Sequence, residues 1–124
     1  KDVTKYLMPT FDQATSALLN DLDIRGLLKE TLVVAIGEMG RTPQANAEWG
    51  RNHWSTLFPA LIAGAGVRNG LVYGASDKDA AFPIDHPVTP EDLAATIYHA
   101  MGIDPETRIN DMQGRPVSIV DGGA

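Results

Sequence analysis

Residues 31–54, TLVVAIGEMGRTPQANAEWGRNHW, carry the clearest structural signal in the chain. Their first part, Leu32 to Ile36, is apolar without polar alternation, which is typical of a strand buried on both faces of a parallel α/β sheet. Glycines and polar residues follow at once, from Gly37 to Arg41. Because ligands in such sheets bind beyond the carboxyl ends of the strands, we expect a functional site where this strand ends.

Length and composition narrow the class of protein. The chain has 124 residues, 44% of them hydrophobic, which suits one domain with one modest core. A net charge of -6 and ten scattered Lys and Arg residues predict no nucleic-acid partner. No apolar run approaches the roughly 20 residues that span a bilayer, and residues 1–6 contain no signal-peptide core, so we expect no membrane partner. Zero cysteines exclude disulfides, thiolate metal sites and cysteine nucleophiles, and leave the cellular compartment open. The oligomeric state is not predicted.

Two amphipathic helices are predicted on either side of this stretch. Residues 10–23 repeat apolar side chains at spacings of three and four, and a shorter helical piece follows at 24–30. Residues 90–101 form the second helix, because Thr89 is a good N-cap and Pro90 suits the first helical position. Gly102 marks its end.

Further strands are predicted between residues 57 and 73. Leu57 to Ala63 is interpreted as a second buried strand, and the turn-forming pair Asn69-Gly70 predicts a hairpin that joins residues 60–67 to 71–73. A short extended piece is expected at 81–84. An edge strand is expected at 117–120, because Pro116 donates no hydrogen bond.

Glu38 and Arg41 are the first candidates for chemistry. The Glu38 carboxylate can bind a hard divalent cation or act as a base, and the Arg41 guanidinium matches a sulfate, phosphate or carboxylate group. In the alternative interpretation, Glu38 pairs with Arg41 or caps a helix, and Arg41 braces the loop.

His53 is the third candidate, because a neutral imidazole suits zinc binding or proton transfer. In the alternative interpretation, His53 is hydrogen-bonded inside a loop core beside Trp49 and Trp54. His86, in a turn-rich connector, and His99, in the last turns of the second helix, are interpreted as structural.

Four motifs together resemble the C-terminal portion of a large bacterial family of unknown function, related to sulfatases within the alkaline-phosphatase superfamily. These motifs are residues 37–43, 50–54, 72–77 and 87–98, so the resemblance covers almost the whole chain. It implies an α/β fold, the C-terminal part of an alkaline-phosphatase or sulfatase-like sheet with flanking helices. Residues 1–124 would then be a single domain, a fragment of a larger sulfatase-like domain. Many members begin with an export signal, which implies an exported or periplasmic protein.

The resemblance also implies a metal site. In active relatives an Asp-His or Asp-Asn metal pair follows the strand, and here Glu38-Met39 occupies that place while His53 resembles the later ligand. A divalent metal, whether zinc, calcium or magnesium, would be bound by Glu38, Asn52 and His53. Met39 departs from the pattern because a thioether does not replace imidazole for such cations. Asn52 also departs, since the family more commonly has Asp there.

The expected function is that of a hydrolase acting on sulfate or phosphate esters, inactive as an isolated fragment. Arg41 and His53 would be the catalytic residues, and a small anionic ester or a sulfated glycan the ligand. The alternative is a non-catalytic binding or scaffolding module of the same fold, of unknown function. In a third interpretation, residues 37–54 form a structural loop in which Glu38 and Arg41 are an ion pair and both tryptophans serve in packing.

Overall fold

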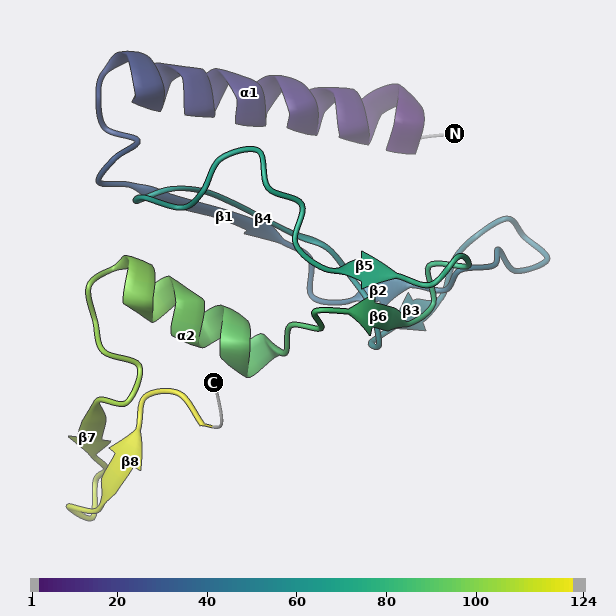
Figure 1. Cartoon of the computed structure of the whole chain (residues 1–124). Helices are drawn as coiled ribbons and strands as arrows, with labels where there is room; N and C mark the ends of the chain where they lie inside the picture. Colours follow the sequence, from purple (N-terminus) through teal and green to yellow (C-terminus); the bar gives the residue numbers. More distant parts are fainter. Residues whose placement is uncertain (1–2, 122–124) are drawn as a thin grey trace.

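The computed structural model of the chain describes residues 3–121 (Figure 1). Its longest element is helix α1, Met8–Ile24, which follows a π-helical turn at Val3–Leu7. The second helix, α2, spans Pro90–Ala100. Both predicted helices are confirmed, and α1 begins slightly earlier than its apolar repeat indicated. The shorter helical piece expected at 24–30 is wrong beyond Ile24, because residues 25–30 form turns.

The start of α2 has the predicted cap. The Asp92 backbone N–H donates to Thr89 Oγ1 at 3.1 Å, and the Thr89 backbone N–H donates to Asp92 Oδ2 at 2.9 Å. This reciprocal capping box satisfies two backbone donors at the helix entry. Gly102 follows the helix with a φ of 75°, a left-handed conformation that favours glycine.

The central strand pair is antiparallel. Strand β1, Leu32–Ile36, pairs with β4, Ala60–Gly64, in a register that runs from Leu32↔Gly64 to Ile36↔Ala60. The prediction of a parallel strand at 32–36 is therefore wrong. A parallel neighbour requires a crossover connection, usually a helix, whereas residues 37–59 return to the edge of β1 without a helix. The second strand was correctly expected, although it begins at Ala60.

Three small hairpins complete the fold. Strands β2, Gly40–Arg41, and β3, His53–Trp54, form the first. Strands β5, Ala75–Ser76, and β6, Pro83–Asp85, form the second, and β7, Arg108–Asn110, and β8, Pro116–Ser118, form the third. The pieces expected near 81–84 and 117–120 correspond to β6 and β8, each shifted along the chain. The strand expected at 71–73 is wrong, because those residues are irregular and lie between the turn at 69–70 and strand β5.

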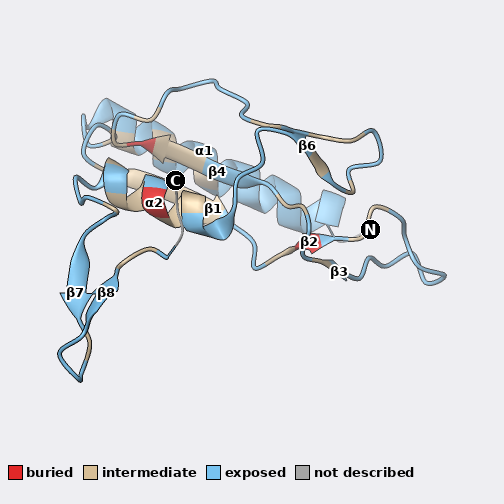
Figure 2. Ribbon diagram, turned by 60° about the horizontal axis from the view of Figure 1, so that its bottom comes forward, coloured by how far each residue is buried: buried red, intermediate tan, exposed pale blue. Residues whose placement is uncertain are grey.

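The elements form three open layers. Helices α1 and α2 lie on opposite sides of the β1–β4 pair (Figure 1). Most of the described chain is intermediate (tan) or exposed (pale blue) when coloured by burial (Figure 2). Among the described residues, Ala95 is the single buried hydrophobic side chain. The expectation of one modest core is therefore wrong for the described residues. The apolar faces of the helices and of the β1–β4 pair do not pack closely enough to exclude solvent.

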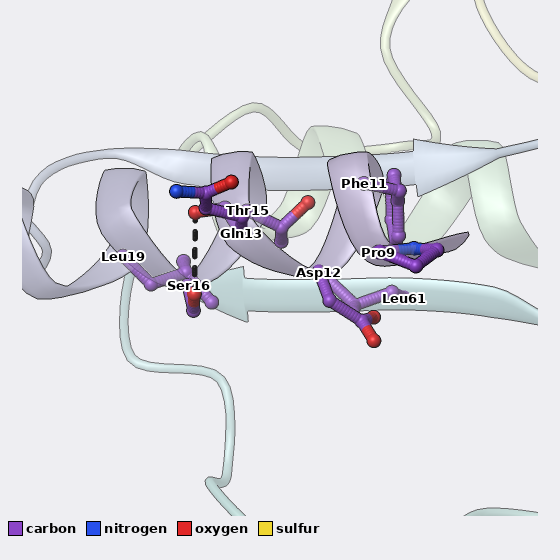
Figure 3. A pocket seen from close by; sticks show the side chains of 8 residues that line it. All are labelled: Pro9, Phe11, Asp12, Gln13, Thr15, Ser16, Leu19 and Leu61. Carbon is purple, nitrogen blue, oxygen red and sulfur yellow. Dashed lines mark hydrogen bonds between the residues drawn. The ribbon is translucent and has the colours of Figure 1, made fainter. Parts of the chain in front are cut away.

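Helix α1 covers strand β4 loosely. A hollow of about 540 Å³ lies between α1 and Leu61 of β4, and it is lined on the helix side by Phe11 and Leu19 among others (Figure 3). Phe11 and Leu18 keep 44% and 48% of their surface exposed. Neither helix in the described part has the length and hydropathy needed to cross a membrane.

Candidate functional site

The candidate site is built on the β2–β3 hairpin. Arg41 lies directly opposite His53 in the strand register, and the ladder continues where the Thr42 backbone N–H donates to the Asn52 carbonyl at 2.9 Å. Directly opposed residues of an antiparallel pair have Cβ atoms about 4.5–5.5 Å apart. Because side chains alternate along a strand, Arg41 and His53 share one face, while Asn52 and Trp54 belong to the other.

Gly40 sets the position of Arg41. It is buried, and a Cβ atom there would collide with the Leu57 carbonyl oxygen and lie 2.8 Å from the Trp54 carbonyl oxygen. Only glycine therefore permits this close approach of three backbone segments. The hairpin is held against residue 57, and its other face presents Arg41.

Glu38 completes the group. Arg41 Nη2 donates to Glu38 Oε1 at 3.0 Å, and Arg41 Nη1 donates to the Gly40 carbonyl at 3.3 Å. The side chains of Arg41 and Glu38 are 45% and 63% exposed, so this is a surface ion pair. The pKa of Glu38 is lowered, first by the hydrogen bond from Arg41 and then by a backbone hydrogen bond, with smaller attractions from the charges of Arg41 and His53.

The structure thus brings Glu38, Arg41 and His53 together and leaves Asn52 on the opposite face. The alternative in which Glu38 pairs with Arg41 is confirmed. The alternative in which His53 lies inside a loop core beside Trp49 and Trp54 is wrong for Trp49, because Trp49 is 90% exposed. Metal binding by Glu38, Asn52 and His53 stays a prediction. Across residues 3–121, no three His, Asp or Glu side chains gather closely enough to bind a metal ion.

The loop between β2 and β3 contains structural residues that the sequence did not reveal. Asn46 Oδ1 accepts the backbone N–H groups of Glu48 and Gly50 at 3.1 and 2.8 Å. Arg51 Nη1 donates to the carbonyl oxygens of Thr42 and Pro43. The turn preference of Asn was a usable signal for the hydrogen bonds of Asn46, whereas nothing in the local sequence indicated those of Arg51.

The other two histidines lie outside this group. His86 Nδ1 lies 2.8 Å from Asp85 Oδ1, and its ring is 5.2 Å from that of Tyr73. His99 occupies the last turn of α2. The structural role of both histidines stays a prediction.

Comparison with known protein families gives a match over the whole chain. Residues 1–124 match the family described as "Protein of unknown function (DUF1501)". No curated protein and no solved structure matches the chain significantly. The assignment to a sulfatase-related family in the alkaline-phosphatase superfamily is therefore wrong, because the matching family is one of unknown function and nothing in the comparisons links it to those enzymes.

Proposed function

The chain belongs to the DUF1501 family of unknown function, and we propose that it contributes part of the active site of a hydrolase for sulfate or phosphate esters. The observation that carries this proposal is the shared face of the β2–β3 hairpin. There a guanidinium, a carboxylate and an imidazole come from Arg41, Glu38 and His53. Transfer of an anionic ester group needs charge stabilisation and a proton carrier, and these three side chains can supply both.

Each side chain has a distinct role. Arg41 offers planar donors that match two oxygens of a tetrahedral anion. Glu38 orients the guanidinium through the 3.0 Å contact and leaves part of its donor set for a ligand. His53, across the hairpin from Arg41, is the group suited to carrying a proton between reacting groups.

A divalent metal fits these residues poorly. A catalytic zinc ion generally takes three protein ligands, and the described side chains of this face supply two, Glu38 and His53. Asn52 belongs to the opposite face of the hairpin. We therefore derive no step of the proposed reaction through a metal.

We propose further that this chain alone is inactive. The side chains of Arg41 and Glu38 lie at an open surface, where water competes with a bound ester and weakens electrostatic stabilisation. A second wall, contributed by a polypeptide that covers the exposed apolar surface, would exclude that water. Aryl phosphate and aryl sulfate esters should accordingly give no product with the chain alone, and robust turnover would contradict this part of the proposal.

Anion binding tests the site directly. Inorganic phosphate and sulfate, titrated at pH 7 into isotope-labelled chain, should shift the NMR signals of the Arg41 guanidinium and the His53 ring. Arg41→Gln should abolish the His53 shift, because the anion loses its main donor.

Arg115→Gln is the matched control. Arg115 also forms an ion pair with a carboxylate in a hairpin, because its Nη2 lies 2.7 Å from Asp111 Oδ2, and its own side chain is 74% exposed. Anion-induced shifts of equal size at Arg41 and Arg115 would mean attraction to any surface arginine, and the proposed site would be wrong.

The second candidate is a non-catalytic binding module. It is favoured by one observation, that the Arg41 guanidinium is already paired with Glu38. Thermal shift with zinc, calcium and magnesium tests whether either candidate binds a metal, since a ligand of the folded state stabilises it by RT ln(1 + [L]/Kd). No rise in Tm is expected, because the face supplies two metal ligands at most. A rise that is lost in both Glu38→Ala and His53→Ala would contradict the poor fit of a metal, and a rise that both variants keep would place any bound metal elsewhere.

A further inference from the structure

The face of the β2–β3 hairpin opposite Arg41 and His53 forms a separate groove. Nine residues from two distant parts of the chain line it, and its volume is about 580 Å³. Ligand pockets in proteins commonly enclose about 300–1,000 Å³. The lining residues are Thr42, Pro43, Gln44, Ala45, Asn46, Asn52, Trp54, Asp79 and Ala81. None of the three residues of the proposed ester site belongs to this groove.

Hydrogen bonds hold the two walls in place. Trp54 Nε1 donates to the Ala81 carbonyl at 2.7 Å, which ties the hairpin to the 79–81 turn. Thr42 Oγ1 donates to the Gln44 carbonyl at 2.9 Å and accepts the Asn52 backbone N–H at 3.2 Å. The groove is therefore largely formed before a ligand arrives, which reduces the ordering cost of binding.

Three polar side chains of the groove have no partner within residues 3–121. The side-chain amides of Gln44 and Asn52 and the carboxylate of Asp79 make no hydrogen bond to another described residue. Each amide both donates and accepts, and the carboxylate accepts from two donors. Hydroxyl groups, which also donate and accept, complement such a set.

The charge of the lining argues against an anionic ligand. Asp79 is the only charged residue among the lining residues. Arg51 is not among the lining residues, and its Nη1 is already bonded to the Thr42 and Pro43 carbonyl oxygens. An anion would meet the Asp79 carboxylate without a lining cation, whereas an uncharged polyhydroxyl compound meets no such repulsion.

Trp54 supplies an apolar surface for the same ligand. Its indole N–H is bonded to Ala81, and its ring lies 5.7 Å from Phe82 in an edge arrangement. A half-buried aromatic ring beside amides and a carboxylate is a combination that suits a sugar ring, which has an apolar face and a rim of hydroxyl groups.

We infer that this groove, here called the amide groove, binds a neutral oligosaccharide. The inference is independent of the proposed hydrolase, because the ester site occupies the opposite face of the hairpin. Either proposal can fail while the other stands.

Titration with defined sugars tests the inference. Cellohexaose, xylohexaose and maltohexaose serve as neutral probes, and a heparin-derived hexasaccharide serves as the anionic probe. NMR should show shifts of backbone amides in residues 42–54 and 79–81 with at least one neutral probe. Tryptophan fluorescence should change in parallel, because Trp54 lines the groove. The inference would be overturned if no neutral probe caused a shift at about 10 mM, which corresponds to very weak binding. Shifts with the heparin fragment alone would also overturn it.

Side-chain variants locate the binding. Gln44→Ala and Asn52→Ala should each weaken binding of the responding sugar about 3- to 10-fold, the usual effect of losing a neutral hydrogen bond. Gln44 is exposed and its side chain has no bond to another described residue, so its loss should not disturb the fold. Asn110→Ala, an exposed amide on the remote hairpin β7–β8, is the control (Figure 1). Equal affinities of the Gln44 and Asn110 variants would show that the amide groove is not the binding site.

Discussion

Glu38 is the residue whose ionisation reports the candidate site most directly. Its pKa is lowered mainly by the hydrogen bond from Arg41. A carboxyl group with a lowered pKa stabilises the folded state above its unfolded pKa, and this contribution is lost as pH falls through the folded pKa. Arg41→Gln should therefore raise the titration midpoint of Glu38, measured from its side-chain carboxyl NMR signal. An unchanged midpoint would mean that the ion pair does not persist in solution.

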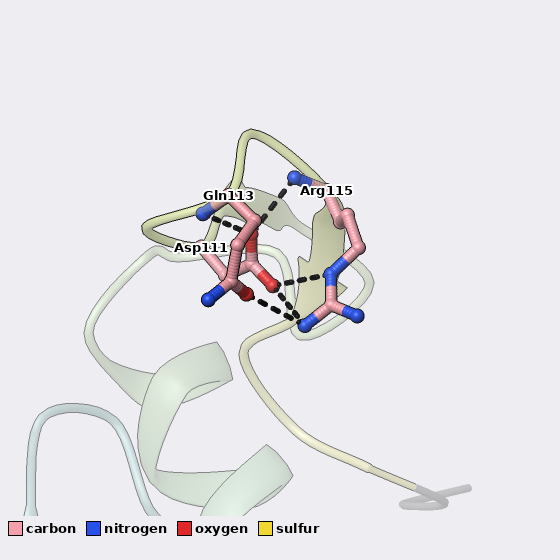
Figure 4. A network of polar contacts seen from close by, with 3 residues as sticks. All are labelled: Asp111, Gln113 and Arg115. Carbon is pink, nitrogen blue, oxygen red and sulfur yellow. Dashed lines mark hydrogen bonds and ion pairs between the residues drawn. The ribbon is translucent and has the colours of Figure 1, made fainter.

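Asp111, at the opposite end of the molecule, is a second carboxyl group whose pKa is lowered by hydrogen bonds. Its carboxylate accepts the Arg115 backbone N–H at 2.9 Å, the Gln113 backbone N–H at 2.9 Å and Arg115 Nε at 2.8 Å (Figure 4). These bonds lower the pKa of Asp111, the backbone bond from Arg115 most.

Acidification should therefore open this hairpin only at low pH, as the pH falls through the lowered pKa of Asp111. Hydrogen exchange of the Gln113 and Arg115 amides measures the opening. Asp111→Asn should make the exchange of both amides insensitive to pH across the same range, after correction for intrinsic rates. If the wild-type amides already lose protection at the ordinary pKa of an aspartate, the hydrogen bonds to Asp111 are absent in solution.

The contacts of the candidate site were only partly predictable from the sequence. The spacing of Glu38 and Arg41 allowed both an ion pair and a ligand site, because three residues in a loop permit either arrangement. Pairing of Arg41 with His53 depends on the β2–β3 register, and nothing in Gly40-Arg41 or His53-Trp54 alone specifies a strand so short. The amide groove was missed for a similar reason, since Asp79 and Ala81 lie far from Thr42 in the sequence.

At the scale of elements, the cap of α2 is the most local feature and the easiest to test. Thr89→Ala removes the acceptor for the Asp92 backbone N–H and should destabilise the helix by about 1 kcal/mol. The amide protection of α2 in hydrogen exchange should fall about fivefold. Thr107→Ala is a suitable control, because Thr107 is exposed and lies outside both helices. Equal losses in the two variants would show that the cap contributes nothing.

The β1–β4 pair depends on a close approach at Gly64. Its φ is 84°, and a Cβ atom would collide with the Thr31 carbonyl oxygen and lie 2.8 Å from that of Leu28. Gly66 has a similar φ of 79°, but a Cβ atom at that position would meet nothing within 4 Å. Both Gly→Ala variants incur the left-handed penalty of about 1–2 kcal/mol, but only the one at position 64 adds a collision.

Gly64→Ala should therefore weaken the β1 and β4 amide protection far more than Gly66→Ala does. Hydrogen exchange of Val33 to Ala35 measures this difference. Similar effects of the two variants would mean that the close approach at Gly64 is absent in solution, because the backbone penalty is shared.

Helices and strands differ in how well the sequence predicted them. The apolar repeat of α1 and the cap of α2 are local signals, and both helices appear where they were expected. The apolar run of β1 predicted a strand but carried no information on its partner. Its antiparallel pairing with β4 is set by the path that residues 37–59 take back to the edge of β1. That path depends on many residues together.

At the scale of the whole molecule, the chain exposes more surface than a compact monomer of its size, and many large hydrophobic side chains are part of that surface. The accessible surface is 9906 Å², whereas a compact monomer of 13.3 kDa exposes about 6,500 Å². The difference exceeds the area that each partner buries in a standard interface, about 800 Å². Strands β1 and β4 have only each other as partners within residues 3–121, so the pair has two open edges. Such a surface is expected to be covered in the functional state, which is why we propose that the ester site is completed from outside this chain.

This exposure predicts an unusual heat capacity of unfolding. The unfolded chain would expose about 19,000 Å², so folding to the observed surface buries about three-quarters of what a compact chain of this length would bury. The heat-capacity increment scales with buried area, and a compact chain of this length should give about 1.7 kcal/mol/K. We expect about 1.2 kcal/mol/K by scanning calorimetry on material shown to be monomeric by analytical ultracentrifugation. An increment near the compact value, about 1.7 kcal/mol/K, in the monomer would show that the chain closes a core in solution and needs no covering partner. The same increment in an oligomer would instead identify a second copy of the chain as the covering partner, because association would then bury the apolar faces of α1, β1 and β4.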